Sequence, residues 1–182
     1  MQASGPLPPE RLQPVALAGK RLQLPEIKAT FFCVGENAKK HSELYKYITD
    51  EGHFVGNHTF NHIKGWKTSL DKYVNNVSQC AEYISSNLFR PPYGKITPGQ
   101  YNELKNQYKL IFWDVLLPDY DVTISAEKCM DILKRKVRPG SILVFHDNLK
   151  AKNKLTTLLP GALDFLLQQG YEIQPVTNNI LK

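Results

Sequence analysis

Short runs of β-branched and aromatic residues alternate with longer amphipathic segments from Lys28 to the end of the chain. The short runs are typical of strands, whereas apolar residues three and four positions apart indicate helices. Leu70, Tyr73, Val74 and Val77, for example, share one helical face. We predict strands at 29–34, 53–57, 87–90, 110–115, 141–145 and 171–176, and helices at 38–49, 70–85, 98–106, 126–136 and 155–168.

The alternation of strands and helices predicts a parallel sheet, and the apolar run 142–145 predicts that both of its faces are covered. The fold class is therefore α/β, as a barrel or a doubly wound sheet. In either architecture the functional residues lie at the carboxyl ends of the strands. The polar and charged residues that follow predicted strands are His58, His62, Arg90, Tyr93, Asp114, Asp119, His146 and Asp147.

At 182 residues and 42% hydrophobic composition, the chain has enough apolar residues for one core. We expect an irregular, atypical segment at 1–27 and one domain at 28–182. No apolar run approaches the length of a membrane span, and the N-terminus lacks a signal-peptide pattern. The sequence therefore does not indicate in which cellular compartment the protein works. The net charge of +6 comes from lysines spread along the chain, which favours a solvated surface or an anionic wall polymer over nucleic acid.

Three cysteines, Cys33, Cys80 and Cys129, are far apart and form no CxxC pair. This spacing predicts small core residues, not a disulfide framework or a cysteine metal site.

The segment 56–62, Gly-Asn-His-Thr-Phe-Asn-His, places two histidines four residues apart. Neutral imidazole is a common ligand of zinc and also suits cobalt and nickel. A catalytic metal usually takes a third protein ligand, often a carboxylate. The spacing alone fits two loop-capping histidines equally well. The convergence of four such segments on one face favours a metal site.

Two further segments carry candidate chemistry. Residues 90–94, Arg-Pro-Pro-Tyr-Gly, form a rigid turn that can hold an arginine near a carboxylate and aim backbone amides at an oxyanion. Alone, the same segment reads as a tight turn with a surface arginine. His146 ends a buried strand and, paired with Asp119, can act as a general acid; alone, it reads as a core histidine with satisfied hydrogen bonds.

Together these segments resemble the polysaccharide deacetylase family, also called carbohydrate esterase family 4. The resemblance covers roughly residues 28–176 and depends on the order and spacing of its motifs. Those motifs are 28–32 (Lys-Ala-Thr-Phe-Phe), 58–62 (His-Thr-Phe-Asn-His), 90–94, 113–115 (Trp-Asp-Val) with the later aspartate, and 146–147 (His-Asp).

The resemblance implies a distorted (β/α) barrel and metal-dependent removal of acetyl groups from a polysaccharide or oligosaccharide such as peptidoglycan, chitin oligomers or xylan. A divalent metal, zinc first and cobalt or nickel as alternatives, is then held by two histidines. The resemblance implies that His58 and His62 are metal ligands and that Arg90 pairs with the catalytic base. It implies that the Tyr93 amide donates to the oxyanion and that His146, paired with Asp119, is the general acid. Tyr120 and Val144 would line the pocket for the acetyl group. The family usually has tryptophan where Tyr120 stands.

The family's first motif, a strand that ends in Thr-Phe-Asp-Asp-Gly-Pro, has only Gly5-Pro6 as its counterpart here. We therefore expect that the first strand, the catalytic base and the third metal ligand are missing. Metal binding and deacetylation should then be weak or absent. The alternative is a catalytically inactive carbohydrate-binding member of the family. A missing strand also exposes the edge of 29–34, which predicts a homodimer or domain swap. A third possible function is hydrolysis of small cyclic amides, which no residue in the sequence specifically favours.

Overall fold

The strands of the molecule pair in parallel throughout, as the sequence predicts. The structure, a computed structural model, describes residues 27–178. One sheet has the order β1 (Thr30–Cys33), β2 (Phe54–Asn57), β3 (Leu88–Phe89), β4 (Lys109–Leu110). A second sheet pairs β5 (Val115–Leu116) with β6 (Leu143–Val144). The short strands place the carboxyl ends of β2, β3 and β6 next to the polar segments that follow them.

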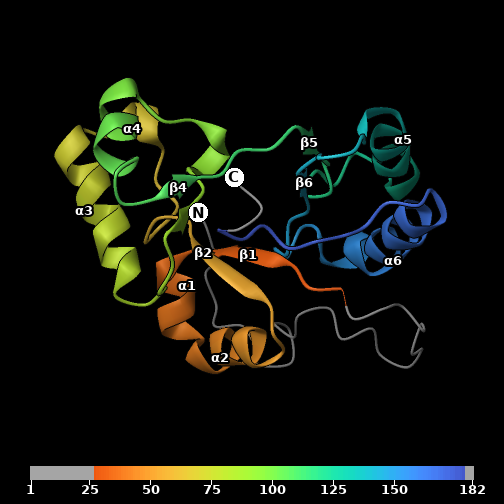
Figure 1. The fold of residues 1–182 in the computed structure, drawn as a ribbon, viewed down its shortest axis with the longest axis horizontal. Helices are drawn as coiled ribbons and strands as arrows, with labels where there is room; N and C mark the ends of the chain where they lie inside the picture. Colours follow the sequence, from red (N-terminus) through yellow and green to blue (C-terminus); the bar gives the residue numbers. More distant parts are fainter. Residues whose placement is uncertain (1–26, 179–182) are drawn as a thin grey trace.

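The helices fall into two groups (Figure 1). Four surround the larger sheet: α1 (Gly35–Lys40), α2 (Ser42–Asp50), α3 (Leu70–Ala81) and α4 (Pro98–Leu104). The other two, α5 (Ala126–Lys136) and α6 (Lys152–Gln168), pack against each other beside the smaller sheet. Short 3₁₀ turns, η2 (Gly65–Lys67) and η3 (Pro92–Gly94), precede α3 and α4. No helix among residues 27–178 is long and apolar enough to cross a membrane.

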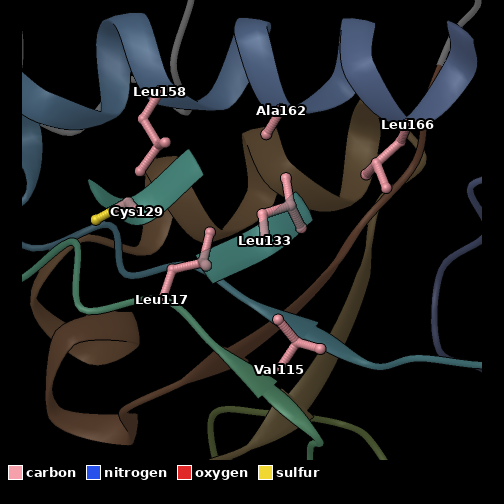
Figure 2. Packing of buried hydrophobic residues seen from close by; sticks show 7 residues of the cluster. All are labelled: Val115, Leu117, Cys129, Leu133, Leu158, Ala162 and Leu166. Carbon is pink, nitrogen blue, oxygen red and sulfur yellow. The ribbon is translucent and has the colours of Figure 1, made fainter. Parts of the chain in front are cut away.

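The core of the smaller unit forms where α5 and α6 cover β5 (Figure 2). Side chains of α6 point toward those of α5 and toward the strand segment 115–117. Cys129 and Leu133 are fully buried, and Cys80 is fully buried in a separate cluster with Ile84. Two of the three cysteines are thus core residues, as predicted. The cluster consists of Val115, Leu117, Cys129, Leu133, Leu158, Ala162 and Leu166.

Local capping explains why two of the predicted helices begin where they do. The Ser125 hydroxyl accepts a hydrogen bond from the Lys128 N–H at 3.2 Å and caps α5. Thr97 and Gln100 form a reciprocal capping box at the start of α4, where Pro98 occupies the first turn.

The bounds of several predicted elements differ from the structure. The helix at 38–49 is two helices, because the backbone leaves helical geometry at His41. The helix at 70–85 ends at Ala81. The strand at 110–115 is two strands, β4 and β5, that belong to different sheets, so Asp114 precedes a strand instead of following one.

Asp114 stabilises a turn and does not lie with the candidate site residues. Its carboxylate accepts hydrogen bonds from the Ser141 hydroxyl at 2.9 Å and the Ile142 N–H at 2.8 Å, and it pairs with Arg138 at 3.2 Å. Desolvation opposes ionisation of Asp114, but these hydrogen bonds outweigh it and lower the pKa. The carboxylate therefore ties the start of β5 to the turn before β6.

The predicted strand at 171–176 does not form. Residues 171–177 have no strand assignment, and the contact with the sheet is a side-chain hydrogen bond from the Thr30 hydroxyl to the Val176 carbonyl at 2.7 Å. Within residues 27–178, β1 has β2 as its one strand neighbour and forms the edge of its sheet. Apart from Ile27, the predicted irregular segment 1–27 lies outside the described residues.

Candidate active site

The two histidines of the 58–62 segment lie together at the carboxyl end of β2. Their ring centroids are 4.9 Å apart in an edge-to-face arrangement. The His62 ring also contacts the Tyr93 ring at 4.8 Å between centroids. Burial is the main cause that lowers the pKa of both His58 and His62, and the charge of His146 lowers both further, so His146 lies near the two rings. The structure thus brings His58, His62, Tyr93 and His146 into one site.

His58 has its tautomer fixed by the backbone. Its Nδ1 lies 2.6 Å from the Arg90 carbonyl oxygen, which can only accept, so Nδ1–H is the donor and Nε2 carries the lone pair. Burial lowers the His58 pKa to about 3, and the Arg90 carbonyl only partly offsets this effect. Burial also lowers the His62 pKa. Both imidazoles are therefore neutral at neutral pH, the form that binds a metal.

Asn57 shapes the turn that presents these rings. It is fully buried, its amide donates to the Val77 carbonyl at 2.9 Å, and its Oδ1 accepts from the Thr59 N–H at 2.9 Å. Thr59 and His62 both have left-handed backbone angles, with φ of 64° and 58°. Such strain in residues other than glycine persists where surrounding contacts hold it. The sequence reasoning missed Asn57, although an asparagine that bonds its own backbone two residues on is a known turn signal.

The two histidines supply part of a metal site. Neutral nitrogen donors on adjacent rings suit a divalent metal as two of its ligands. Within residues 27–178, however, no group of three or more His, Cys, Asp or Glu side chains could hold a metal ion. The described part of the chain therefore provides two protein ligands and not the third that a catalytic zinc site usually has.

His146, which follows β6, forms a hydrogen-bonded pair with Asp119. The fully buried Asp119 carboxylate lies 2.7 Å from His146 Nδ1 through one oxygen and accepts the His146 backbone N–H at 2.7 Å through the other. This geometry leaves His146 Nε2 free to exchange a proton with a ligand. The Tyr120 ring packs edge-to-face on His146 at 4.6 Å between centroids, and Val144 is buried two residues earlier on β6.

Arg90 is buried without a carboxylate partner among the described residues. Its side chain is 9% exposed, its guanidinium carbon lies 4.0 Å from the Phe32 ring centroid, and its Nε donates to the Ile111 carbonyl at 3.4 Å. Burial lowers the Arg90 pKa to about 10. Buried charges in proteins are normally paired with an opposite charge. The buried Arg90 guanidinium therefore favours the binding of an anion beside it.

The Arg-Pro-Pro-Tyr-Gly segment is the rigid turn that the sequence predicts. Tyr93 has a left-handed backbone with φ of 60°, and its N–H has no hydrogen-bond partner among residues 27–178. Gly94, with φ of 63°, packs so closely on Trp113 that an added Cβ would lie 2.5 Å from the indole. The turn therefore leaves an amide donor without a partner among the described residues, in the residue whose ring contacts His62.

Two surface hollows of about 430 and 350 Å³ lie elsewhere. They are lined by residues that precede β3 and β4 in one case and β5 and β6 in the other, at the amino ends of these strands. They are not part of the candidate site.

The site thus combines paired histidines, a buried arginine and a His–Asp pair at the carboxyl ends of strands in a parallel α/β fold. The sequence profile of the polysaccharide deacetylase family matches residues 18–109. The chain belongs to this family.

Individual relatives agree with this assignment. A peptidoglycan-N-acetylglucosamine deacetylase of Bacillus cereus is 32% identical over 133 residues, which cover 69% of this chain and 48% of that protein. A solved peptidoglycan N-acetylglucosamine deacetylase superposes with a TM-score of 0.75 at 28% identity, covering 84% of this chain and 73% of that one. The chain thus spans about half the length of the first of these relatives.

A pseudoenzyme of carbohydrate esterase family 4 from Bacillus anthracis has the same fold. Its TM-score is 0.75 at 24% identity, covering 85% of this chain and 56% of that one. This likeness concerns the fold alone.

Proposed function

We propose that this chain binds acetylated peptidoglycan strands at the site formed by His58, His62 and His146, and removes acetyl groups with the help of a divalent metal, most simply zinc. The observation that carries the proposal is the neutral histidine pair, with Nε2 of His58 free, facing a His146–Asp119 pair in one site. We choose peptidoglycan over chitin or xylan as the substrate because the two relatives given above are named as peptidoglycan deacetylases.

The side chains have complementary tasks in this reaction. His58 and His62 would hold a divalent metal, and the chemistry that it would supply is Lewis-acid polarisation of the acetyl carbonyl. His146, held by Asp119, protonates the leaving amine. The free Tyr93 amide donates to the developing oxyanion, a contribution of about 3 kcal/mol for a well-placed donor. Tyr120 and Val144 enclose the acetyl methyl group beside His146.

We further propose that this polypeptide deacetylates weakly. Water activation needs a carboxylate base, and Arg90 has no carboxylate partner among the described residues. The first aspartate of the sequence is Asp50, far beyond the position of the family's first motif. The loss of a general base lowers the rate by roughly 10² to 10⁴.

The test is acetate release from peptidoglycan oligosaccharides and N-acetyl chitooligosaccharides, with zinc or cobalt added. We expect slow release for the wild type, only slightly above background, and background release for His58→Ala. A rate well above background that His58→Ala abolishes would show that a complete catalytic site exists, and the weak-activity proposal would be wrong.

A second candidate function is carbohydrate binding without catalysis. It is favoured by the absence, within residues 27–178, of any group of three potential metal ligands. Glycan binding that persists unchanged after chelation and in His58→Ala would support the binder. Binding that requires both the metal and His58 would support the enzyme.

We also propose that β1, the edge strand of its sheet among the described residues, pairs with a second copy, as a homodimer or by strand exchange. Multi-angle light scattering at several concentrations tests this proposal. A strict monomer at every concentration would rule it out.

A further inference from the structure

Two exposed aromatic rings and two lysines form a patch beside the candidate site, here called the Trp66 patch and defined as Lys64, Trp66, Tyr93 and Lys95. The Trp66 and Tyr93 rings meet edge-to-face, 5.5 Å apart between centroids. Trp66 is 41% exposed and Tyr93 is 49% exposed. Lys64 Nζ lies 5.4 Å from the Tyr93 centroid, and Lys95 Nζ lies 5.2 Å from the Trp66 centroid. Aromatic surface of this kind packs on the C–H face of a sugar ring.

The patch is continuous with the candidate site. Tyr93 contacts the His62 ring on one side and the Trp66 ring on the other. A glycan chain whose acetylated sugar lies at His62 therefore places a neighbouring sugar over Trp66.

Buried contacts hold the two halves of the patch together. The Gln100 side chain is fully buried, and its amide donates to the carbonyls of Gly65 and Thr68, both at 3.0 Å. An added Cβ on Gly65 would lie 2.9 Å from the Lys95 carbonyl oxygen, so the two segments are in direct contact. The patch is thus preorganised, which lowers the entropy that a ligand loses on binding.

The charge of the patch is one-sided. No Asp or Glu occurs between Glu51 and Asp71 or between Glu82 and Glu103, the two segments that carry the patch. Among the described residues, neither Lys64 nor Lys95 forms an ion pair. Both ammonium groups therefore remain available to an anionic group on a ligand, and neither of these two segments contains a carboxylate that would repel it.

We propose that the Trp66 patch is a glycan subsite for a carboxylate-bearing amino sugar, of the kind that carries a lactyl ether in peptidoglycan strands, next to the acetylated sugar at His62. The inference rests on the proposed function for the position of the acetylated sugar. The aromatic pair contacts the sugar ring, and Lys64 and Lys95 contact the carboxylate. A neutral glycan makes the first contact and not the second.

The test is a binding titration followed by the indole N–H signal of Trp66 in NMR, assigned by its loss in Trp66→Phe. The probes are a peptide-free tetrasaccharide of alternating N-acetylglucosamine and N-acetylmuramic acid, the same compound as its methyl ester, and chitotetraose. We expect the acid to bind about fivefold more tightly than the ester, the size expected for two exposed ion pairs. Added salt should remove this preference, because it screens exposed charges.

Variants separate the roles of the lysines. Lys64→Gln with Lys95→Gln should reduce the affinity for the acid to that for the ester and leave the affinity for the ester unchanged. Lys134→Gln is the matched control, because Lys134 lies over the Phe165 ring at 5.7 Å in the separate α5–α6 unit. It should bind both probes as the wild type does.

Equal affinity for acid and ester, unchanged acid binding in the double lysine variant, or a Trp66 signal that no probe shifts would each overturn the proposal. The measurement does not depend on acetate release. Charge-dependent binding without detectable deacetylation would leave the subsite in place and favour the non-catalytic carbohydrate binder, whereas deacetylation without charge preference would refute the subsite alone.

Discussion

A single carbonyl oxygen, that of Arg90, determines which nitrogen of His58 faces the site. The bond connects the segment after β3 with the segment after β2, so the orientation of the His58 ring depends on the packing of two strands. Asp119 does the same for His146 by accepting both its ring N–H and its backbone N–H. At the residue scale, the chemistry of the site is set by these two orienting acceptors.

Stability should fall as the pH is lowered below about 6.5, and His58 should cause part of the fall. Burial holds the folded pKa at about 3, against 6.5 for the ordinary group. In this range the unfolded chain binds a proton that the folded chain does not, so the unfolding free energy decreases as pH falls. Urea unfolding of the metal-free protein at several pH values between 7 and 4 measures this pH dependence of the unfolding free energy. His58→Asn should show a shallower pH dependence; parallel curves would contradict the prediction.

Asp119→Ala should destabilise the protein by about 1–3 kcal/mol, because it removes the acceptor of the His146 backbone N–H from a buried position. Urea unfolding at pH 7 measures the loss. Glu103→Ala, on the exposed surface of α4, is the control and should change stability by less than about 0.5 kcal/mol. Equal effects of the two substitutions would refute the assigned role of Asp119.

At the element scale, helices with clear caps and apolar faces were predictable, and short or interrupted elements were not. The helix at 126–136 was predicted with its observed bounds, since Ser125 caps it and Leu133 faces the core. The run 110–115 looks like one strand because Leu110 and Val115 are both apolar, yet they pair with different strands. The local sequence pattern does not specify which strands pair. It also does not indicate that 171–176 contacts the sheet through a hydrogen bond from the Thr30 side chain and not through backbone hydrogen bonds between strands.

Leu133→Ala should lower the free energy of unfolding by about 2–5 kcal/mol. The Leu133 side chain of α5 is fully buried in the cluster formed with α6 and β5 (Figure 2), and its loss leaves a cavity. Leu70→Ala removes a 41% exposed leucine and should cost much less. Thermal unfolding of both variants tests the assignment. A smaller loss for Leu133 than for Leu70 would show that the α5–α6 core is packed differently.

At the scale of the whole molecule, the site exists because three strand ends meet. The sequence predicted this convergence for His58, His62, Arg90, Tyr93 and His146, since carboxyl ends of parallel strands share one face. It did not predict Asn57 or the Trp66 patch. Both depend on contacts between distant segments, such as Asn57 with Val77 and Gln100 with Gly65, which no local pattern encodes.

The central proposal is that His58 and His62 bind a divalent metal and that residues 27–178 supply no third protein ligand to complete the site. A zinc titration by calorimetry, with His58→Ala as the control, tests it most directly. The account predicts weak binding that is lost on dialysis and is absent in His58→Ala, because two neutral ligands hold a metal poorly without an anionic third. Tight, stoichiometric zinc that survives dialysis in the wild type, or binding unchanged in His58→Ala, would contradict it.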